Sequence, residues 1–447
     1  MPPDRVNGAT VGSGARQGGI ERTLVLHPDI RSASRPARGA DARLDESVGL
    51  ALAIDLEVVH AEAITVPRPR PATLFGKGVV DRFADFVAAT EIGVAVVDAA
   101  LSPVQQRNLE RAWHCKVIDR TGLILEIFGE RARTKEGQLQ VELAALTYQR
   151  SRLVRSWTHL ERQRGGYGFL GGPGESQLEM DRRIITDRIT RIKADLEQVK
   201  RTRELHRAAR RRVPYPIVAL VGYTNAGKST LFNRLTQAEV YAEDLLFATL
   251  DPTMRRVRLP SGLEVVLSDT VGFISDLPTD LVAAFRATLE EVTEADLILH
   301  VRDVAHADAD AQRDDVQAVL DQLGLGDRSE ERIVEVLNKI DLLDEESRAV
   351  LRAKAARAHN QVPCSAATGE GTDDLLTLID RHFAQDQRVV DVAVDLTDGA
   401  SIAWLYDHGQ VVQRHDDDRF AHLRISLDPA DLARFRQRRS RETRHGA

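Results

Sequence analysis

The stretch Gly222-Tyr-Thr-Asn-Ala-Gly227-Lys228-Ser229 decides the fold that we expect for the centre of this chain. Its spacing, Gly-x-x-x-x-Gly-Lys-Ser, is that of a phosphate-binding loop. Residues 217–221 before it form an apolar, strand-like run, and residues 229–235 after it have helical spacing. A strand, a glycine-rich turn and a helix in this order direct backbone N–H groups and a helix N-terminus at phosphate oxygens. We therefore expect a P-loop within an α/β domain.

A second stretch predicts which base is bound. Asn338-Lys-Ile-Asp341 follows the strand-like run 333–337. The carboxylate of Asp341 can accept hydrogen bonds from both N1–H and the exocyclic amine of guanine. Adenine offers no such pair of donors and would leave a buried carboxylate unpaired, which is heavily penalised. The two stretches together predict a domain that binds GTP and hydrolyses it.

The catalytic and metal-binding candidates surround the P-loop. Lys228 is expected to reach the β- and γ-phosphates, and Ser229 to ligate Mg²⁺. Asp269-Thr-Val-Gly272 ends the strand-like run 263–268. There the Asp269 carboxylate can hold Mg²⁺ through water, and the Gly272 N–H can meet the γ-phosphate. Thr249 could complete the metal shell, although a loop threonine is ordinarily only a capping residue.

The remaining candidates complete the nucleotide site. The turn Ser365-Ala-Ala-Thr368 follows Asn338 in the expected order and can present backbone N–H groups to the guanine carbonyl. The catalytic candidates are Lys228, Thr249 and Gly272, and the metal candidates are Ser229, Thr249 and Asp269. The nucleotide-binding candidates are Gly222, Tyr223, Thr224, Asn225, Ala226, Gly227, Lys228, Ser229, Thr230, Phe247, Ala248, Thr249, Leu250, Asp251, Asp269, Thr270, Val271, Gly272, Asn338, Lys339, Ile340, Asp341, Cys364, Ser365 and Ala366.

Two positions bear on how hydrolysis proceeds. In Ras-like GTPases a Gln after the Asp-x-x-Gly glycine positions the attacking water, and Phe273 stands there in this chain. A phenyl ring cannot make that hydrogen bond, so we expect slow intrinsic hydrolysis; the alternative is that Phe273 merely packs beneath the switch segment. Asn225 occupies a P-loop position where some GTPases hold K⁺, and its other interpretation is a loop-forming residue.

Residues 131–212 form a basic segment. They carry 20 Lys and Arg against 10 Asp and Glu, a balance of +10 in a chain whose net charge is −7. Apolar residues recur with helical spacing at Leu139, Leu143 and Leu146, and again at Ile185, Ile189, Ile192 and Leu196. Between them, residues 165–174 contain six glycines, which disfavour a helix. This pattern predicts an antiparallel helical hairpin whose arginines bind a phosphate backbone or, alternatively, form a solvated face.

Length and composition set the remaining expectations. A chain of 447 residues exceeds one ordinary core, and it contains neither a secretory leader nor an apolar run long enough to cross a bilayer. Cys115 and Cys364 stand far apart without metal-ligand spacing, which fits a cytoplasmic protein. We expect five segments: a disordered tail (1–21), an N-terminal α/β domain (22–130), the hairpin (131–212), the P-loop domain (213–387) and a small α+β domain with a frayed end (388–447).

Several stretches resemble the HflX family of ribosome-associated GTPases. These are residues 117–121, 131–137, 172–175, 181–183, 222–230, 269–273 and 285–291. The resemblance runs from about residue 23 to 385 and extends to the short C-terminal domain. The stretches outside the P-loop domain make it specific, because other translational GTPases lack the glycine-rich hairpin.

The resemblance implies binding to the large ribosomal subunit and its rRNA, and separation of ribosomes into subunits under stress. It also implies that the hairpin loop, residues 165–175 here, reaches toward the peptidyl-transferase region. The chain departs from the family there, since many members carry Arg before Gly-Pro-Gly where this chain has Phe169-Leu170-Gly171. An rRNA contact through that arginine is therefore in question.

These observations together predict a Mg²⁺-dependent GTPase, monomeric in solution, that binds the large ribosomal subunit in its GTP state. Two alternatives remain. The first is a guanine-nucleotide-gated RNA-binding scaffold with little catalysis, which Phe273 favours. The second is ATP-dependent RNA remodelling through the N-terminal region, where Phe75-Gly76-Lys77-Gly78 lacks P-loop spacing and more simply forms a turn into a helix.

Overall fold

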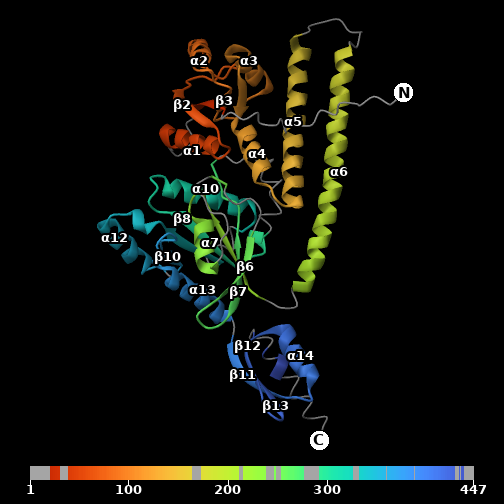
Figure 1. Cartoon of the computed structure of the whole chain (residues 1–447), viewed down its shortest axis with the longest axis vertical. Helices are drawn as coiled ribbons and strands as arrows, with labels where there is room; N and C mark the ends of the chain where they lie inside the picture. The colour runs from red at the N-terminus through yellow and green to blue at the C-terminus, as the bar shows by residue number, and fades with distance from the viewer. Residues whose placement is uncertain are drawn as a thin grey trace. The chain divides into compact units, whose positions relative to one another are not determined.

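The computed structural model describes residues 21–30, 39–163, 173–210, 215–237, 246–247, 253–275, 291–325, 332–358, 360–386, 388–427, 432 and 434–436. The expected tail and frayed C-terminus lie largely outside these residues. Contacts divide the chain into two compact units, with the boundary after Ile124. Figure 1 labels the elements of both units, and each unit is described by itself.

The N-terminal unit is built on a four-stranded parallel sheet of order β2-β1-β3-β4. Its elements are β1 (Arg22–Asp29), α1 (Ala40–Leu52), β2 (Glu57–Thr65), α2 (Lys77–Thr90), β3 (Val94–Val97), α3 (Pro103–Trp113) and β4 (Lys116–Asp119). Ser102 caps α3 in a full capping box with Gln105. The fully buried aromatic ring system of Trp113 anchors the core, and its indole N–H donates to the Val80 carbonyl at 3.0 Å.

A buried ion network lies at the carboxyl ends of this sheet. His27 and Arg120 both bond the carboxylate of Asp98, at 2.8 and 2.5 Å, and Arg120 also pairs with Glu46. Burial by itself raises the pKa of Asp98, but Arg120 and His27 together hold that pKa below its ordinary value. The network joins β1, α1 and the residues that directly follow β3 and β4, so it connects the sheet with a helix that covers it.

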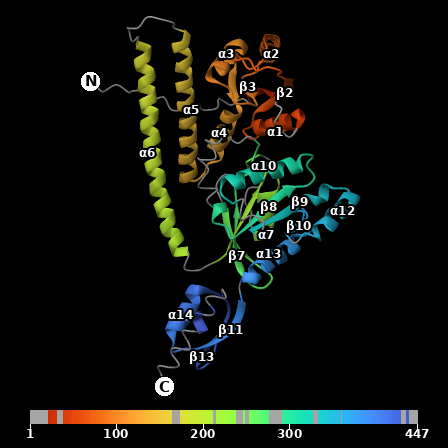
Figure 2. The same cartoon turned by 180° about the vertical axis from the view of Figure 1, so that it is seen from behind.

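Two long helices follow α4 (Arg120–Arg131). They are α5 (Lys135–Gln163) and α6 (Pro173–Arg210), which run side by side in opposite directions in both views (Figures 1 and 2). Leu146, Ile189 and Ile192 form the buried core between them, and Leu139, Leu143, Ile185 and Leu196 pack against it. The apolar residues that recur with helical spacing therefore form the contact between the two helices, as the sequence predicts. The connector 164–172 lies outside the described residues, and α6 already begins at Pro173.

The P-loop domain has a six-stranded sheet of order β10-β9-β8-β5-β7-β6. Its strands are β5 (Ile217–Gly222), β6 (Thr253–Arg258), β7 (Glu264–Asp269), β8 (Leu297–Asp303), β9 (Ile333–Asn338) and β10 (Gln361–Pro363). All neighbours are parallel except β6 and β7. From β5 the chain passes to the edge strand β6, returns through β7 beside β5, and then runs outward through β8, β9 and β10 on the other side. The carboxyl end of β5 is therefore a topological switch point, where ligands of open α/β sheets bind.

Helices of the same domain carry the site or cover the sheet. They are α7 (Lys228–Thr236), α10 (Ala309–Gln322), the 3₁₀ turn η2 (Ile340–Leu342), α12 (Glu345–Ala355) and α13 (Thr372–Asp386). Leu231 and Phe232 of α7 and Leu375 of α13 belong to one buried cluster with the strands. This shared core fixes the P-loop helix against the sheet.

The C-terminal part is a small α+β fold. Its elements are β11 (Arg388–Asp395), α14 (Gly399–His408), β12 (Gly409–Asp416) and β13 (Phe420–Leu427), and the antiparallel sheet has the order β11-β13-β12. Leu405 of α14 packs with Val394, Ile425 and Phe435 in its core.

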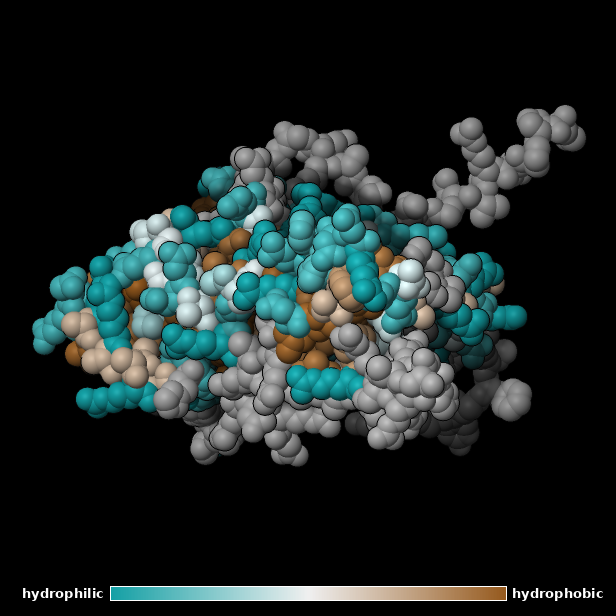
Figure 3. All heavy atoms as spheres, turned by 90° about the horizontal axis from the view of Figure 1, so that it is seen from below, coloured by the Kyte–Doolittle hydropathy of each residue, from teal (hydrophilic) through white to brown (hydrophobic). Residues whose placement is uncertain are grey.

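The surface seen in Figure 3 is mainly hydrophilic, with a smaller hydrophobic area on the same face. Among the helices that the structure describes, none combines the length and apolarity needed to cross a membrane.

Candidate functional site

The P-loop lies where β5 meets its neighbouring strand closely. Gly222 has φ 153°, and a Cβ atom there would stand 2.2 Å from the Val301 carbonyl oxygen of β8. Gly227 has φ 91°, and its Cβ would stand 2.3 Å from Nδ2 of Asn338. Both glycines are therefore required by close approach as well as by backbone conformation.

The side chain of Lys228 is buried against the backbone of the P-loop. Its Nζ donates to the carbonyls of Gly222 and Tyr223, at 3.1 and 2.8 Å. Burial lowers the pKa of Lys228 to about 8, and Asp269 opposes the shift only in part. The ammonium group is thus held at the phosphate loop, desolvated before any ligand binds.

Ser229 and Asp269 supply the oxygen atoms that a magnesium ion needs. The Ser229 hydroxyl donates to Oδ2 of Asp269 at 2.7 Å, and Asp269 is fully buried at the end of β7. Hydroxyl and carboxylate oxygens are the ligands that Mg²⁺ takes in proteins, usually with several waters retained. The residues present therefore fit the metal that the sequence predicts.

The segment after β7 is hydrogen-bonded to the P-loop backbone. The Thr224 N–H donates to the Phe273 carbonyl at 2.7 Å, and the Phe273 N–H donates to the Gly222 carbonyl at 3.1 Å. The Phe273 side chain is 2% exposed, so it packs beneath this segment and offers no hydrogen bond. Gly272 has no room for a side chain, because a Cβ would stand 2.9 Å from the Thr224 Cα.

Three predicted site residues use their polar groups within the protein. The Thr270 hydroxyl donates to the Leu220 carbonyl at 2.5 Å, and the Tyr223 hydroxyl accepts from the Ser275 N–H at 2.7 Å. The ammonium group of Lys339 pairs with Asp303 at 2.8 Å. These side chains shape the site through protein contacts, whereas the buried Thr224 hydroxyl has no partner among the described residues.

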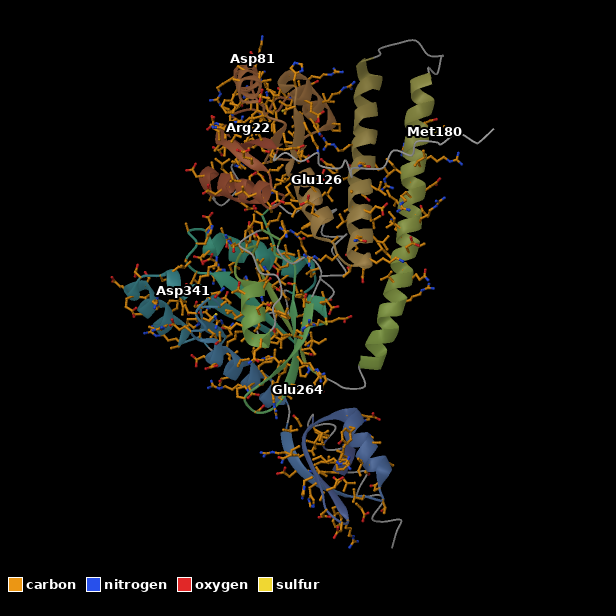
Figure 4. The ribbon with its side chains drawn as sticks, in the orientation of Figure 1. Arg22, Asp81, Glu126, Met180, Glu264 and Asp341 are labelled. Atoms are coloured by element: carbon orange, nitrogen blue, oxygen red, sulfur yellow. The ribbon has the colours of Figure 1, made fainter. Side chains whose placement is uncertain are left out.

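The base-reading residues meet the P-loop through Asn338. Its Nδ2 donates to the Ala226 carbonyl at 2.7 Å, and its Oδ1 accepts from the Ala366 N–H at 2.9 Å. Asp341 lies beyond the end of β9 (Figure 4), and within the described part of the chain its buried Oδ1 has no hydrogen-bond partner. An unsatisfied buried carboxylate oxygen is costly unless a ligand donates to it, as guanine would.

The turn 365–368 differs in one respect from the sequence prediction. The turn was expected to present backbone N–H groups to the guanine carbonyl, and one of them, the Ala366 N–H, donates to Asn338 instead. The Ser365 N–H donates to the Glu370 carbonyl and the Thr368 N–H to the Ser365 hydroxyl. Among the described residues, the Ala367 N–H has no acceptor, so it is the donor left for a ligand carbonyl.

The other candidates divide into buried and exposed residues. Ile340 is 1% exposed, and Cys364 is fully buried, where burial first and Asp341 second raise its pKa to about 12. Asn225 is exposed with φ 58°, and Thr230 is exposed on the first turn of α7. Ala226, Ala366 and Val271 are buried, and they contribute backbone groups and packing rather than polar side chains.

The switch segment before β6 is described only in part. Phe247 is 3% exposed and lies edge-on against Phe128, with ring centroids 4.7 Å apart. Residues 248–252 lie outside the described residues, so the predicted roles of Ala248, Thr249, Leu250 and Asp251 stay predictions.

Comparison with known families covers most of the chain. Residues 41–129 and 131–210 match the N-terminal and middle regions of the GTP-binding GTPase family. Residues 217–339 match the family described as 50S ribosome-binding GTPase, and residues 350–441 match the HflX C-terminal domain.

Curated relatives give the same result at high identity. The chain is 51% identical to the GTPase HflX of Magnetococcus marinus over 89% of this chain and 91% of that protein. The chain belongs to the HflX family of GTPases. The Escherichia coli GTPase HflX is 50% identical over 76% of this chain and 79% of its own length.

A solved GTP-binding protein of Sulfolobus solfataricus, crystallised with GDP, is also similar. It is 21% identical, with a TM-score of 0.44 over 82% of this chain and 99% of that protein. Membership of the HflX family rests on the sequence relatives and not on this structure.

As an HflX-family member with a P-loop GTPase domain, the chain is a GTP hydrolase with GTP as its substrate. The predicted residues did not include Arg234, whose guanidinium Nε donates to the Ala366 carbonyl at 2.6 Å, and the prediction for the turn 365–368 did not single out the Ala367 N–H. Nothing in the sequence marks Arg234, an arginine on an exposed helix surface, and the turn prediction covered the Ala367 N–H without distinguishing it from its neighbours.

Proposed function

We propose that this HflX-family GTPase binds the large ribosomal subunit in its GTP state and dissociates or rescues ribosomes under stress. The family description of residues 217–339 as a 50S ribosome-binding GTPase supports the partner. The observation that carries the proposal is the basic helical pair α5–α6, with a balance of +10 over residues 131–212. We further propose that the protein acts as a monomer in the cytoplasm.

The charges on α6 support rRNA as the contact. Arg182, Arg183 and Arg191 are exposed and face solvent, whereas Arg188 is engaged by Glu142 at 2.7 and 3.0 Å. Among the described residues no ion pair engages these three arginines, so they can neutralise phosphates and release counterions, which makes binding steeply dependent on salt.

Sedimentation with purified large subunits tests this proposal. The protein is loaded with GDP or a non-hydrolysable GTP analogue, and binding is measured from about 50 to 200 mM salt. We expect tighter binding with the analogue, and a triple change of Arg182, Arg183 and Arg191 to Gln should reduce the salt slope by about 2 to 3.

The matched control changes three surface arginines outside the hairpin, Arg255, Arg313 and Arg357, to Gln. This control should leave both the affinity and the salt slope near those of the unchanged protein. Equal losses in the two triple variants would refute the hairpin as the rRNA contact.

We propose that Lys228, Ser229, Asp269, Gly272 and Thr249 carry the hydrolysis. Ser229 and Asp269 would hold Mg²⁺, which would supply charge neutralisation at the phosphate oxygens when bound. Lys228 binds the same phosphates. Gly272 allows the segment after β7 to pack closely on the P-loop, so that its N–H can contact the γ-phosphate.

The missing hydrogen bond at Phe273 makes the ribosome the proposed source of water positioning. We expect GTP turnover to be slow alone and to rise at least about tenfold with large subunits, because positioning a reactant can be worth orders of magnitude in rate. The nucleotide-gated scaffold remains the second candidate, and turnover that stays negligible with subunits would favour it.

Potassium is a further proposal for the P-loop. Asn225 is exposed in a left-handed conformation, and its side chain makes no hydrogen bond within the described residues, so it is available to a cation. Turnover in K⁺ buffer should exceed turnover in Na⁺ buffer at equal ionic strength, and equal rates would dismiss the role.

A further inference from the structure

Arg234 connects the phosphate-binding helix to the base-reading loop. It lies in the last turn of α7, the helix that begins in the P-loop. Its Nε donates to the Ala366 carbonyl at 2.6 Å, and its Nη2 donates to the Ala367 carbonyl. One guanidinium therefore holds two successive carbonyls of the loop 365–368, a fork that a rigid arginine can present and a lysine cannot.

The loop is shaped to receive this guanidinium. Gly369 has φ 93°, and a Cβ there would stand 2.9 Å from Nη1 and 3.4 Å from Cζ of Arg234. A glycine at this position thus serves two purposes: it adopts the left-handed turn, and it leaves space for the arginine.

The contacts form a closed circuit through the nucleotide site. Asn338 bonds the Ala226 carbonyl of the P-loop and the Ala366 N–H of the base-reading loop. Arg234 bonds the carbonyl of that same Ala366, and α7 leads back to the P-loop. Ala366 is therefore held on both sides of its backbone, once by a base-reading residue and once by the phosphate-binding helix.

Bonds within the loop maintain its shape but do not set its position relative to the P-loop. Ser365 accepts from the Thr368 N–H at 3.1 Å and from the Gly369 N–H at 2.8 Å. The Cys364 N–H, directly before the loop, donates to the Leu337 carbonyl of β9 at 2.9 Å. Within the loop, Asn338 and Arg234 bond the backbone from other segments. Their joint effect is to aim the unoccupied Ala367 N–H.

We propose that Arg234 is a positioning residue that sets the loop 365–368 for purines with a carbonyl at C6. It touches no ligand atom itself and acts through the Ala366 and Ala367 backbone. The inference rests on the assignment of this loop to guanine, which Asp341 variants test separately.

Three nucleotides separate positioning from general damage to the site. GDP has both the C6 carbonyl and the exocyclic amine, inosine diphosphate keeps only the carbonyl, and 2-aminopurine riboside diphosphate keeps only the amine. Dissociation constants of the full-length protein are measured for all three, together with its thermal unfolding midpoint.

In Arg234→Ala, we expect the affinities for GDP and for inosine diphosphate each to fall about tenfold, which corresponds to a loss of RT ln 10 in binding free energy. Affinity for the 2-aminopurine nucleotide should change less than about twofold, because that base offers the loop no carbonyl. Arg234→Lys should give an intermediate loss, and kcat at saturating GTP should stay within about threefold.

Arg313→Ala removes the same charge from α10, where Arg313 pairs with the nearby Asp310 and Asp314, and serves as the control. It should leave all three affinities unchanged. Equal loss of all three nucleotides in Arg234→Ala, or no loss of GDP, would overturn the proposal. An unchanged GDP preference over inosine diphosphate in Asp341→Asn would instead show that the guanine assignment itself is wrong.

Discussion

Asp341 illustrates how a single side chain can select a base. Its buried Oδ1 has no partner within the described residues, and guanine supplies two donors that would satisfy such a carboxylate. A buried acceptor rejects ligands that cannot donate to it far more strongly than it rewards those that can.

We predict that Asp341→Asn changes the base preference from guanine to xanthine. The amide can donate to the C2 carbonyl of xanthine but cannot accept both donors of guanine, so GDP affinity should fall at least about a hundredfold while xanthosine diphosphate gains. Competition binding with the two nucleotides measures the change. Asp344→Asn, at the cap of α12, is the control and should keep guanine preference; retained GDP affinity in Asp341→Asn would contradict the assignment.

Lys228 gives a prediction about pH. Its pKa of about 8 in the ligand-free protein is lowered by burial, and phosphate oxygens beside the ammonium group would raise it. A group whose pKa rises on binding takes up a proton, so GDP affinity should be constant below about pH 8. Above that pH it should fall by up to about tenfold per unit.

Calorimetry in two buffers of different ionisation enthalpy measures the proton uptake directly. It should be near zero at pH 7 and increase toward pH 9. Affinity that stays flat to pH 9 would show that the ammonium group does not carry phosphate binding.

At the scale of elements, the approach of β5 to β8 determines where the P-loop can form. The Val301 carbonyl occupies the space in which a side chain at Gly222 would stand. Backbone cannot yield as a flexible side chain can, so any larger residue there must separate the two strands.

We therefore predict that Gly222→Ala destabilises the P-loop domain by about 3 kcal/mol or more and abolishes GDP binding. Gly324→Ala is a matched control, because Gly324 also has positive φ (79°) but has nothing within 4 Å of its Cβ position. That control should cost only about 1 to 2 kcal/mol and retain nucleotide binding. Denaturant unfolding of both variants, with and without GDP, makes the comparison; equal costs would refute the role of the strand contact.

At the scale of the whole molecule, the N-terminal unit and the P-loop domain have separate apolar cores. Contacts divide it after Ile124, and the N-terminal unit contains its own apolar cluster around Trp113 and Phe83. Its ion network joins residues from four places in the sequence, and the nucleotide site shares none of these residues.

We predict that Asp98→Asn weakens the N-terminal unit alone. Removing one partner of a buried pair leaves Arg120 poorly compensated and costs about 3 to 5 kcal/mol, while GDP affinity should stay within twofold. The pKa of Asp98 is lowered in the folded protein, so its contribution is present above the unfolded pKa of about 4 and is lost as pH falls below it.

Calorimetry with and without GDP measures this effect. The nucleotide should raise the unfolding temperature of the P-loop domain, since a ligand stabilises only the state that binds it. The transition lowered by Asp98→Asn should not respond to GDP; a single transition that shifts in both experiments would contradict independent cores.

The sequence by itself determined the features that depend on local spacing. The P-loop, the base-reading stretch and the stripes of α5 and α6 are short-range patterns, because a turn or an amphipathic helix is specified by residues a few positions apart. Membership of the HflX family was also predicted from such stretches, and the relatives confirm it.

Only the tertiary structure decided which distant groups meet. It placed β6 antiparallel at the edge of an otherwise parallel sheet, turned the Ala366 N–H toward Asn338, and brought Arg234 to the loop 365–368. The phosphate-binding loop of residues 222–229 could be predicted because its glycine, lysine and serine spacing is contained within eight consecutive residues. The position of the base-reading loop could not, because it depends on hydrogen bonds between segments more than a hundred residues apart.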